Sequence, residues 1–134
     1  MKSYTDLEQS KKLAEILPIE SADMCYIQDL LAGGKYGDYK PYIGNLIPAY
    51  GQDKIRCWSL TALLGVLPNN KHITTTLSRG GWKIEPVEYI DKWFCEYEDK
   101  IDEDSPCREI AVSAENPVDA CVVMVKKLHE LNML

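Results

Sequence analysis

The sequence lacks the residue patterns that most metal sites and disulfide scaffolds require. Its 134 residues include only two histidines, and none of its five cysteines belongs to a C-x-x-C pair. Zinc sites usually use closely spaced Cys or His pairs, and secreted disulfide scaffolds usually have an even number of cysteines. We therefore predict free thiols, no metal and no cofactor, and we expect a cytoplasmic protein, because the cytosol keeps thiols reduced.

Basic runs and long apolar runs are also missing. The formal net charge is −6, and Lys and Arg are scattered along the chain. Nucleic-acid binding depends on clustered Lys and Arg that neutralise phosphates, so we expect no nucleic-acid partner. The N-terminal stretch "MKSYTDLEQSKKL" has no apolar signal-peptide core, and no run approaches the ~20 apolar residues that span a bilayer. We expect no membrane partner.

The length and the apolar content of 46% suit a single domain spanning residues 1–134. A first helix is predicted over Asp6–Leu17, with Thr5 as N-cap, Glu8 completing a capping box and Pro18 ending the helix. A last helix is predicted from Pro117, after the N-cap Asn116, with Asp119 in the first turn. These two helices lie at opposite ends of the chain.

The middle helix is predicted over Leu60–Leu67, with Ser59 as N-cap. This stretch is apolar almost throughout, which is typical of a helix buried on all sides. Gly65 lies inside it and costs about 1 kcal/mol relative to alanine, so it is expected to permit close packing. Pro68 ends the helix.

Three strands are predicted from a period of two: Gly81–Ile90, interrupted or placed at an edge by Pro86, then Lys92–Glu98 and Cys107–Ala114. They form an antiparallel meander, and Ser21–Ile27 is a possible short fourth strand. The Gly-, Tyr- and Pro-rich segment at about 31–54 is predicted to be an irregular loop. The fold class is therefore α+β, with about three helices on a small sheet in the order α-β-α-β-β-β-α.

Three stretches carry a resemblance: "LEQSKKLAEILPIESADMCY", "CWSLTALLGVLP" and "NPVDACVVMVKKLHELN". They resemble a group of short proteins encoded by gut Bacteroides-type bacteria and their phages or mobile elements. The group is uncharacterised, so it supplies no activity and no catalytic residues. The resemblance implies an accessory protein in a bacterial or phage-infected cytoplasm.

Cys57 is the one candidate nucleophile, because it stands just before the middle helix, where a helix N-terminus favours a thiolate. The segment "CWSLTALLGV" is similar to the Cys-Trp-helix segment of papain-like proteases. Those enzymes pair the Cys with a His and place a Gln upstream, so Gln52 and either His72 or His129 are the candidate partners of Cys57. The Gly-rich approach of those enzymes is absent. The simpler interpretation is that Cys57 is a small core residue beside a buried Trp58.

Two weaker patterns do not meet the requirements of known sites. "GGKYG" resembles a phosphate loop, but Tyr36 follows Lys35 where such a loop needs Ser or Thr. "EYEDKIDED" offers Asp102 and Asp104 at alternate positions, but the glycine of a calcium-binding loop is missing. We expect a flexible turn and a solvated loop, respectively.

Binding to another protein is the function that remains after these exclusions, and two groups of residues support it. Tyr is enriched at protein interfaces, and the irregular segment contains Tyr36, Tyr39, Tyr42 and Tyr50. The last helix has more apolar surface than a small sheet covers, which predicts a binding flank at Met124 and Leu131.

We therefore expect a non-enzymatic accessory protein that binds a protein partner or itself. One alternative is a small cysteine hydrolase or acyltransferase that uses Cys57, and another is a structural subunit of a phage-related assembly. Burial of Cys57, Cys95 and Cys121 is expected, as is one core cluster of Trp58, Leu63, Trp93, Val122 and Val125.

Overall fold

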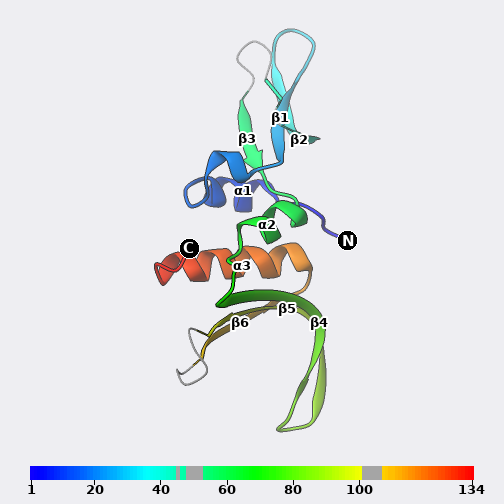
Figure 1. Cartoon of the computed structure of the whole chain (residues 1–134). Helices are drawn as coiled ribbons and strands as arrows, with labels where there is room; N and C mark the ends of the chain where they lie inside the picture. Colours follow the sequence, from blue (N-terminus) through cyan, green and yellow to red (C-terminus); the bar gives the residue numbers. More distant parts are fainter. Residues whose placement is uncertain (45, 48–52, 101–106) are drawn as a thin grey trace.

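A computed structural model describes residues 1–44, 46–47, 53–100 and 107–134. In these residues the chain has a mixed α+β fold with three α-helices and two three-stranded antiparallel sheets (Figure 1). The predicted fold class is confirmed, and the predicted element order closely matches the observed one. The difference is the second sheet, which the sequence pattern did not predict.

The first sheet has the strand order β4-β5-β6 and corresponds to the predicted meander. Its strands are β4 (Ile73–Lys83), β5 (Glu88–Asp99) and β6 (Arg108–Ala114). The prediction placed the first strand too late, at Gly81–Ile90. Pro86 does not interrupt a strand there, because it lies in the turn between β4 and β5.

The second sheet has the order β2-β1-β3, from β1 (Met24–Leu30), β2 (Tyr36–Ile43) and β3 (Lys54–Cys57). The predicted short strand at Ser21–Ile27 corresponds to β1. The predicted irregular loop at about 31–54 is wrong for the segments that form β2 and β3. Because β2 is exposed along most of its length, it shows no apolar alternation, and its strand structure depends on pairing with β1.

The first helix, α1 (Leu7–Ala14), is shorter than predicted and has a different cap. Asp6 is the N-cap, and Gln9 completes the capping box in place of Glu8. Thr5 is instead fully buried, where its hydroxyl oxygen accepts a hydrogen bond from the backbone N–H of Trp58 at 3.1 Å. A short 3₁₀ helix, η1 (Ile19–Ser21), follows Pro18.

The second helix, α2 (Leu60–Val66), begins at the predicted N-cap Ser59. It is not buried on all sides: Leu63 is fully buried, but Leu64 is exposed. A Cβ added to Gly65 would meet no heavy atom within 4 Å, so this glycine does not mediate close packing. The predicted surroundings of this helix are therefore wrong, whereas its position in the chain is confirmed.

The third helix, α3 (Pro117–Glu130), organises the core. Asn116 is its N-cap, with Pro117 in the first turn, as predicted. It packs against β5 and β6 on one side and against α1 and α2 on the other (Figure 1). The predicted core cluster is confirmed, since Trp58, Leu63, Val122 and Val125 are buried together and Trp93 packs against them. Among the described residues, no helix has the length and apolar character to cross a membrane.

Candidate functional site

A two-stranded arm projects from the first sheet. Strand β6 pairs with β5 only as far as the Trp93–Ala114 pair, whereas β4 and β5 continue pairing to Lys83 and Glu88. Within the described part of the chain, the end of the β4–β5 hairpin therefore has no third strand beside it, and it extends away from the helices (Figure 1). Isolated two-stranded hairpins are marginally stable in water, so a projecting arm needs its own stabilising contacts.

Two aromatic rings supply such contacts. Trp82 and Tyr89 are direct cross-strand partners, and their rings meet edge to face with centroids 5.3 Å apart. Such a pair contributes about 0.5–1.5 kcal/mol beyond its area burial. The pairing register shifts between Arg79 and Gly81, and Gly80 between them has a φ of +80°. This bulge lets the ring of Tyr89 lie against Gly80.

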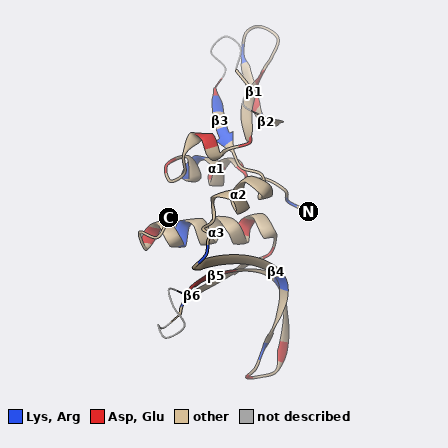
Figure 2. Ribbon diagram, viewed as in Figure 1, with Lys and Arg blue, Asp and Glu red and all other residues tan. Residues whose placement is uncertain are grey.

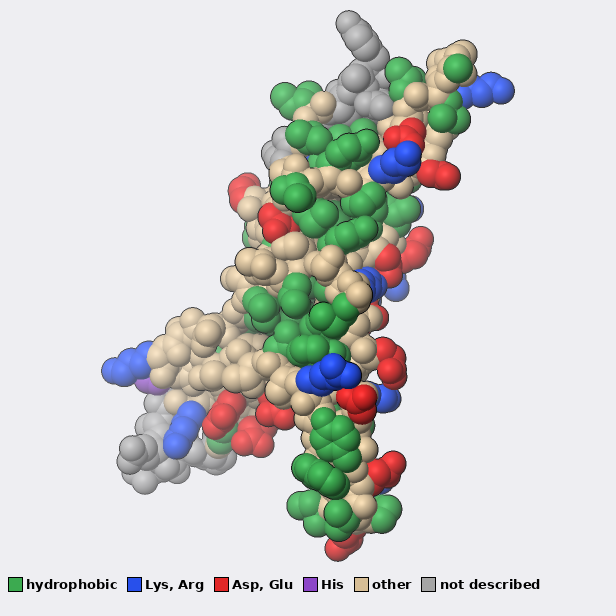
Figure 3. Space-filling view, turned by 90° about the vertical axis from the view of Figure 1, so that its right-hand side faces the viewer, with side chains coloured by type: hydrophobic (Ala, Val, Ile, Leu, Met, Phe, Trp, Pro, Cys, Tyr) green, Lys and Arg blue, Asp and Glu red, His purple; other side chains and the backbone are tan. Residues whose placement is uncertain are grey.

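The tip of the arm is strongly apolar. Trp82, Ile84 and Val87 have exposed fractions of 71%, 80% and 77%, and Tyr89 is 49% exposed. We call these four residues the apolar tip. The space-filling view shows hydrophobic side chains gathered at the end of the arm (Figure 3). Single exposed apolar residues are ordinary, but a cluster of large ones is typical of an interaction site.

Charged side chains flank the tip. Arg79 forms an ion pair with Asp91 at 3.3 Å, at the base of the arm. Closer to the turn lie Lys83, Glu85 and Glu88, all exposed, so acids outnumber bases there (Figure 2). The apolar tip therefore has a mildly acidic border.

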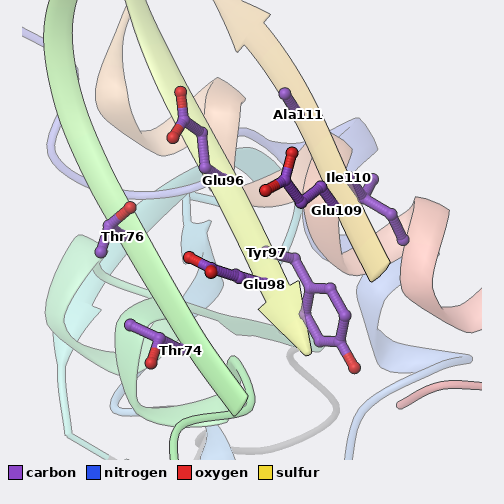
Figure 4. A pocket seen from close by; sticks show the side chains of 8 residues that line it. All are labelled: Thr74, Thr76, Glu96, Tyr97, Glu98, Glu109, Ile110 and Ala111. Atoms are coloured by element: carbon purple, nitrogen blue, oxygen red, sulfur yellow. The ribbon is translucent and has the colours of Figure 1, made fainter. Parts of the chain in front are cut away.

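A second surface feature is a shallow acidic concavity of about 190 Å³ on the outer face of the first sheet. Three strands contribute to it, with Thr74 and Thr76 on β4, Glu96 and Glu98 on β5 and Glu109 on β6 (Figure 4). Glu98 and Glu109 are direct cross-strand partners. Like charges at directly opposed positions destabilise a sheet.

Cys107 adds a thiol beside this acidic pair. The ligand atoms of Glu98, Cys107 and Glu109 lie within 4.8 Å of one another, and the Cys107 thiol donates to Glu98 Oε1 at 3.4 Å. Two carboxylates and a thiol are able to ligate a divalent cation, although exposed acids also gather without one. Asp102 and Asp104, considered above for calcium, lie outside the described residues.

Cys57 does not have the surroundings of a nucleophile. It is fully buried at the end of β3, where its thiol donates to the backbone oxygen of Thr5 at 3.4 Å. Burial raises the pKa of this thiol, and hydrogen bonds to it only partly offset the effect. His72 and His129 are both exposed, and neither bonds to Cys57 within the described part of the chain. Gln52 lies outside the described residues. The expected burial of Cys57, Cys95 and Cys121 is confirmed.

The structure does not gather the predicted tyrosines on one surface. Tyr36 and Tyr42 are exposed on β2. Tyr39 lies on the opposite face of the strand from Tyr42, because the pairing with β1 is regular between them, and it donates to Asp53 Oδ2 at 2.6 Å. That hydrogen bond is the main reason for its raised pKa. Tyr50 lies outside the described residues.

The predicted binding flank on the last helix is wrong in its main residue. Met124 is fully buried in the core, whereas Leu131 is 46% exposed. The prediction expected the sheet and the other two helices to cover only part of the apolar surface of α3. Helices α1 and α2 cover the second side of α3, so no continuous flank through Met124 remains.

The residues of the apolar tip were missing from the predicted site, although the sequence contained a signal. In "WKIEPVEY", the pair Glu85–Pro86 stands between two apolar residues and marks a turn. An apolar residue on each side of a tight turn is expected to be exposed, because a hairpin turn lies at the surface.

Comparison with known proteins adds no family to these observations. No protein-family model, no curated protein and no solved structure matches the chain.

Proposed function

We propose that this chain is a non-enzymatic accessory protein that binds a partner protein through the apolar tip of its β4–β5 arm. The observation that carries the proposal is the position of Trp82, Ile84 and Val87, which are largely exposed on a projecting hairpin. Protein interfaces are enriched in Trp and Tyr, and such residues often dominate the binding energy.

The contact between the two aromatic rings of the tip supports this proposal. The edge-to-face pair of Trp82 and Tyr89, which contributes about 0.5–1.5 kcal/mol, favours one geometry of both rings before binding. Binding then orders fewer side chains, which improves affinity. The mildly acidic border, with Glu85 and Glu88, favours a partner whose apolar pocket has basic residues at its rim.

The origin and compartment of the protein remain predictions. The resemblance to short proteins of gut Bacteroides-type bacteria and their phages implies a bacterial or phage partner. All five cysteines are free thiols, which is in keeping with a reducing cytoplasm. A hydrolase that uses Cys57 is not proposed, because the thiol is buried and no histidine bonds to it among the described residues.

The experiment compares the chain with a tip variant that carries Trp82→Ser and Ile84→Ser. Each protein is immobilised and exposed to lysate of a bacterium that encodes the gene, and captured proteins are identified. The purified partner is then titrated against each protein by calorimetry. We expect the tip variant to bind at least about tenfold more weakly, a loss of about 1.4 kcal/mol or more.

The matched control is Val123→Ser, which changes another exposed apolar residue on α3, away from the arm. This control is expected to bind the partner with unchanged affinity. Equal binding by the tip variant would overturn the proposal. Binding of the chain to vesicles of anionic phospholipid would also overturn the proposal if that binding depends on Trp82, because the tip would then bind a membrane surface and not a protein.

A further inference from the structure

Two of the buried cysteines face each other across the core. Cys95 lies on β5 and Cys121 on α3, and both side chains are fully buried in the same hydrophobic cluster. Helix α3 packs against β5 (Figure 1), and a hydrogen bond links the two thiols. A disulfide requires two cysteines on neighbouring segments whose side chains point toward each other. The hydrogen bond shows that these two side chains do so.

The surroundings of the pair are apolar. The cross-strand partners of Cys95 are Leu77 on β4 and Val112 on β6, and both pack against the core cluster. Packing alone requires no sulfur at either cysteine position, because apolar side chains of similar size fill a core about equally well. Two thiols in contact add a reaction that apolar side chains lack, which is oxidation to a disulfide.

The other cysteines are not placed to compete for this reaction. Cys25 and Cys57 lie on the paired strands β1 and β3, but Cys57 stands opposite Met24, so Cys25 points to the other face of that sheet. The Cys57 thiol donates instead to the backbone oxygen of Thr5. Cys107 is exposed and lies outside the core. The fold therefore brings together one pair of thiols.

We propose that Cys95 and Cys121 are a redox pair, and that a disulfide between them, formed by exchange with a low-molecular-weight disulfide such as oxidised glutathione, cross-links β5 to α3 and stabilises the fold. The thiolate of Cys95 attacks one sulfur of the small disulfide and expels a thiolate. The thiolate of Cys121 then attacks the sulfur of Cys95 and expels the second one. The pair loses two electrons and two protons, and the small disulfide is reduced to two thiols.

The hydrogen bond between the thiols supports this order of attack. The Cys121 thiol donates to Cys95, and this lowers the pKa of Cys95 more than burial raises it. The same hydrogen bond, together with burial, raises the pKa of Cys121. The thiolate is the nucleophile in disulfide exchange, so the thiol that ionises more easily reacts first.

Full burial determines when the exchange takes place. Glutathione does not reach a fully buried thiol in the closed chain, so the disulfide forms when the core opens or before it closes during folding. The same burial then protects the disulfide from reduction. The folded chain therefore retains the redox state that its surroundings had when it folded, and the cross-linked form is the more stable one because a disulfide restricts the unfolded chain.

The test refolds the Cys107→Ser variant, because the exposed thiol of the wild type would link two chains. The reduced variant is unfolded in denaturant, diluted into buffer with equal concentrations of reduced and oxidised glutathione, and quenched with acid. Free thiols are counted, and the disulfide is located by mass spectrometry of unreduced proteolytic fragments. We expect the loss of two of the four remaining thiols, with the disulfide between Cys95 and Cys121 as the main product.

Thermal unfolding then measures the effect of the cross-link. The oxidised form should unfold about 5–15 °C above the reduced form. Cys25→Ala in the same background is the matched control, since Cys25 is also fully buried but lies outside the pair. It should form the same disulfide and show the same rise. Cys121→Ala should keep all its remaining thiols, and its midpoint should not depend on the glutathione ratio.

Retention of four thiols after refolding would overturn the proposal, as would an even mixture of pairings among the four buried cysteines. A cross-linked form that unfolds below the reduced form would also overturn it, because the fold would then not accommodate the bond. These outcomes are read on the Cys107→Ser variant itself and do not require that Cys121→Ala folds.

The redox pair does not depend on the proposed function of the arm. The tip variant Trp82→Ser with Ile84→Ser, in the same Cys107→Ser background, should form the disulfide to the same extent. Failure of the redox pair and failure of the arm's function therefore give different results.

Discussion

The phenolic ring of Tyr89 lies over the Cα atom of Gly80, where an added Cβ would come within 1.7 Å of the Tyr89 hydroxyl oxygen. Gly80 also has a φ of +80°, which favours glycine. The two features together fix the bulge at the base of the arm and hold Tyr89 against Trp82. The geometry of the apolar tip therefore depends on a residue that has no side chain.

We predict that Gly80→Ala displaces the Tyr89 ring and breaks its edge-to-face contact with Trp82. Gly33→Ala is the matched control, because Gly33 has a similar φ of +85° but no atom within 4 Å of an added Cβ. Both variants should lose about 1 kcal/mol of stability from backbone strain, and Gly80→Ala should lose about a further 0.5–1.5 kcal/mol with the ring contact. Only Gly80→Ala should shift the ring proton resonances of Tyr89 and Trp82 in NMR spectra. Unchanged resonances would mean that the ring contact does not depend on Gly80.

Thiol reactivity should distinguish Cys107 from the other cysteines. Cys107 is exposed, whereas the other four are buried. We expect a disulfide reagent to label one thiol per native chain quickly and the remaining thiols only on unfolding. Partial burial, the hydrogen bond to Glu98 and the nearby carboxylates raise the pKa of Cys107, so its labelling rate should still increase above pH 9. Cys107→Ser should abolish the fast phase. Fast labelling that disappears instead in Cys57→Ser would restore the hydrolase hypothesis.

Two neighbouring valines on α3 test the position of the core. Val125 is fully buried, and Val123 is 42% exposed. Val125→Ala removes two buried methyl groups and should lower the free energy of unfolding by about 2 kcal/mol, because it leaves a cavity. Val123→Ala should change it by less than about 0.5 kcal/mol. Chemical denaturation of both variants measures the difference, and equal values would contradict the packing of α3 against the sheet and the other helices.

The helices and strands that were predicted correctly are defined by residues within them or next to them. Asn116 and Pro117 define the start of α3, and the alternation of Trp93, Cys95 and Tyr97 places three side chains on the inner face of β5. The N-cap of α1 was ambiguous, since Thr5 and Asp6 are both good caps and Glu8 and Gln9 both complete a capping box. Burial of Thr5 against Trp58 decides between them, and that contact joins residues far apart in the chain.

The missed features depend on distant parts of the chain. Strand β2 contains Gly37 and Pro41 and is largely exposed, so its own residues do not predict a strand. Burial of Met124 depends on helices that precede it by many residues. The apolar tip was missed because an alternating pattern that contains Pro86 fits either one interrupted strand or two strands joined by a hairpin turn. The pairing of β4 with β5 decides for the hairpin.

The N-terminus is held to α3 by a charged cluster, and this cluster makes stability depend on pH. Lys2 Nζ donates to Asp119 Oδ1 at 2.7 Å and to Asp6 Oδ2 at 3.1 Å. Burial raises the pKa of Asp119, but hydrogen bonds from Lys2, Gln9 and Asn116 outweigh that effect and lower it overall. The pKa of Asp6 is also lowered on balance, and burial of Lys2 is outweighed by its two carboxylate partners, so its pKa is raised.

The directions of these pKa shifts define the pH range over which the charged cluster stabilises the fold. A carboxylate whose pKa is lower in the folded chain stabilises the fold fully above its unfolded pKa of about 3.9, and the contribution is lost as pH falls through the folded value. Lys2 contributes below its unfolded pKa of about 10.4 and loses its contribution as pH rises through the raised folded value. We therefore expect a thermal midpoint that is steady near neutral pH and falls in acid below about pH 4.

Asp119→Asn tests this prediction, because it removes the charge that Lys2 contacts and keeps a side chain of the same shape. The variant should be less stable than wild type at pH 7, by about 1 kcal/mol, and the difference should shrink as the pH falls below about 4. Asp91→Asn is the matched control, since it breaks the exposed ion pair with Arg79, and such pairs contribute little. Its midpoint should follow that of wild type at every pH. A stability difference for Asp119→Asn that stays constant from pH 7 to about pH 2 would show that the carboxylate charge is not the cause.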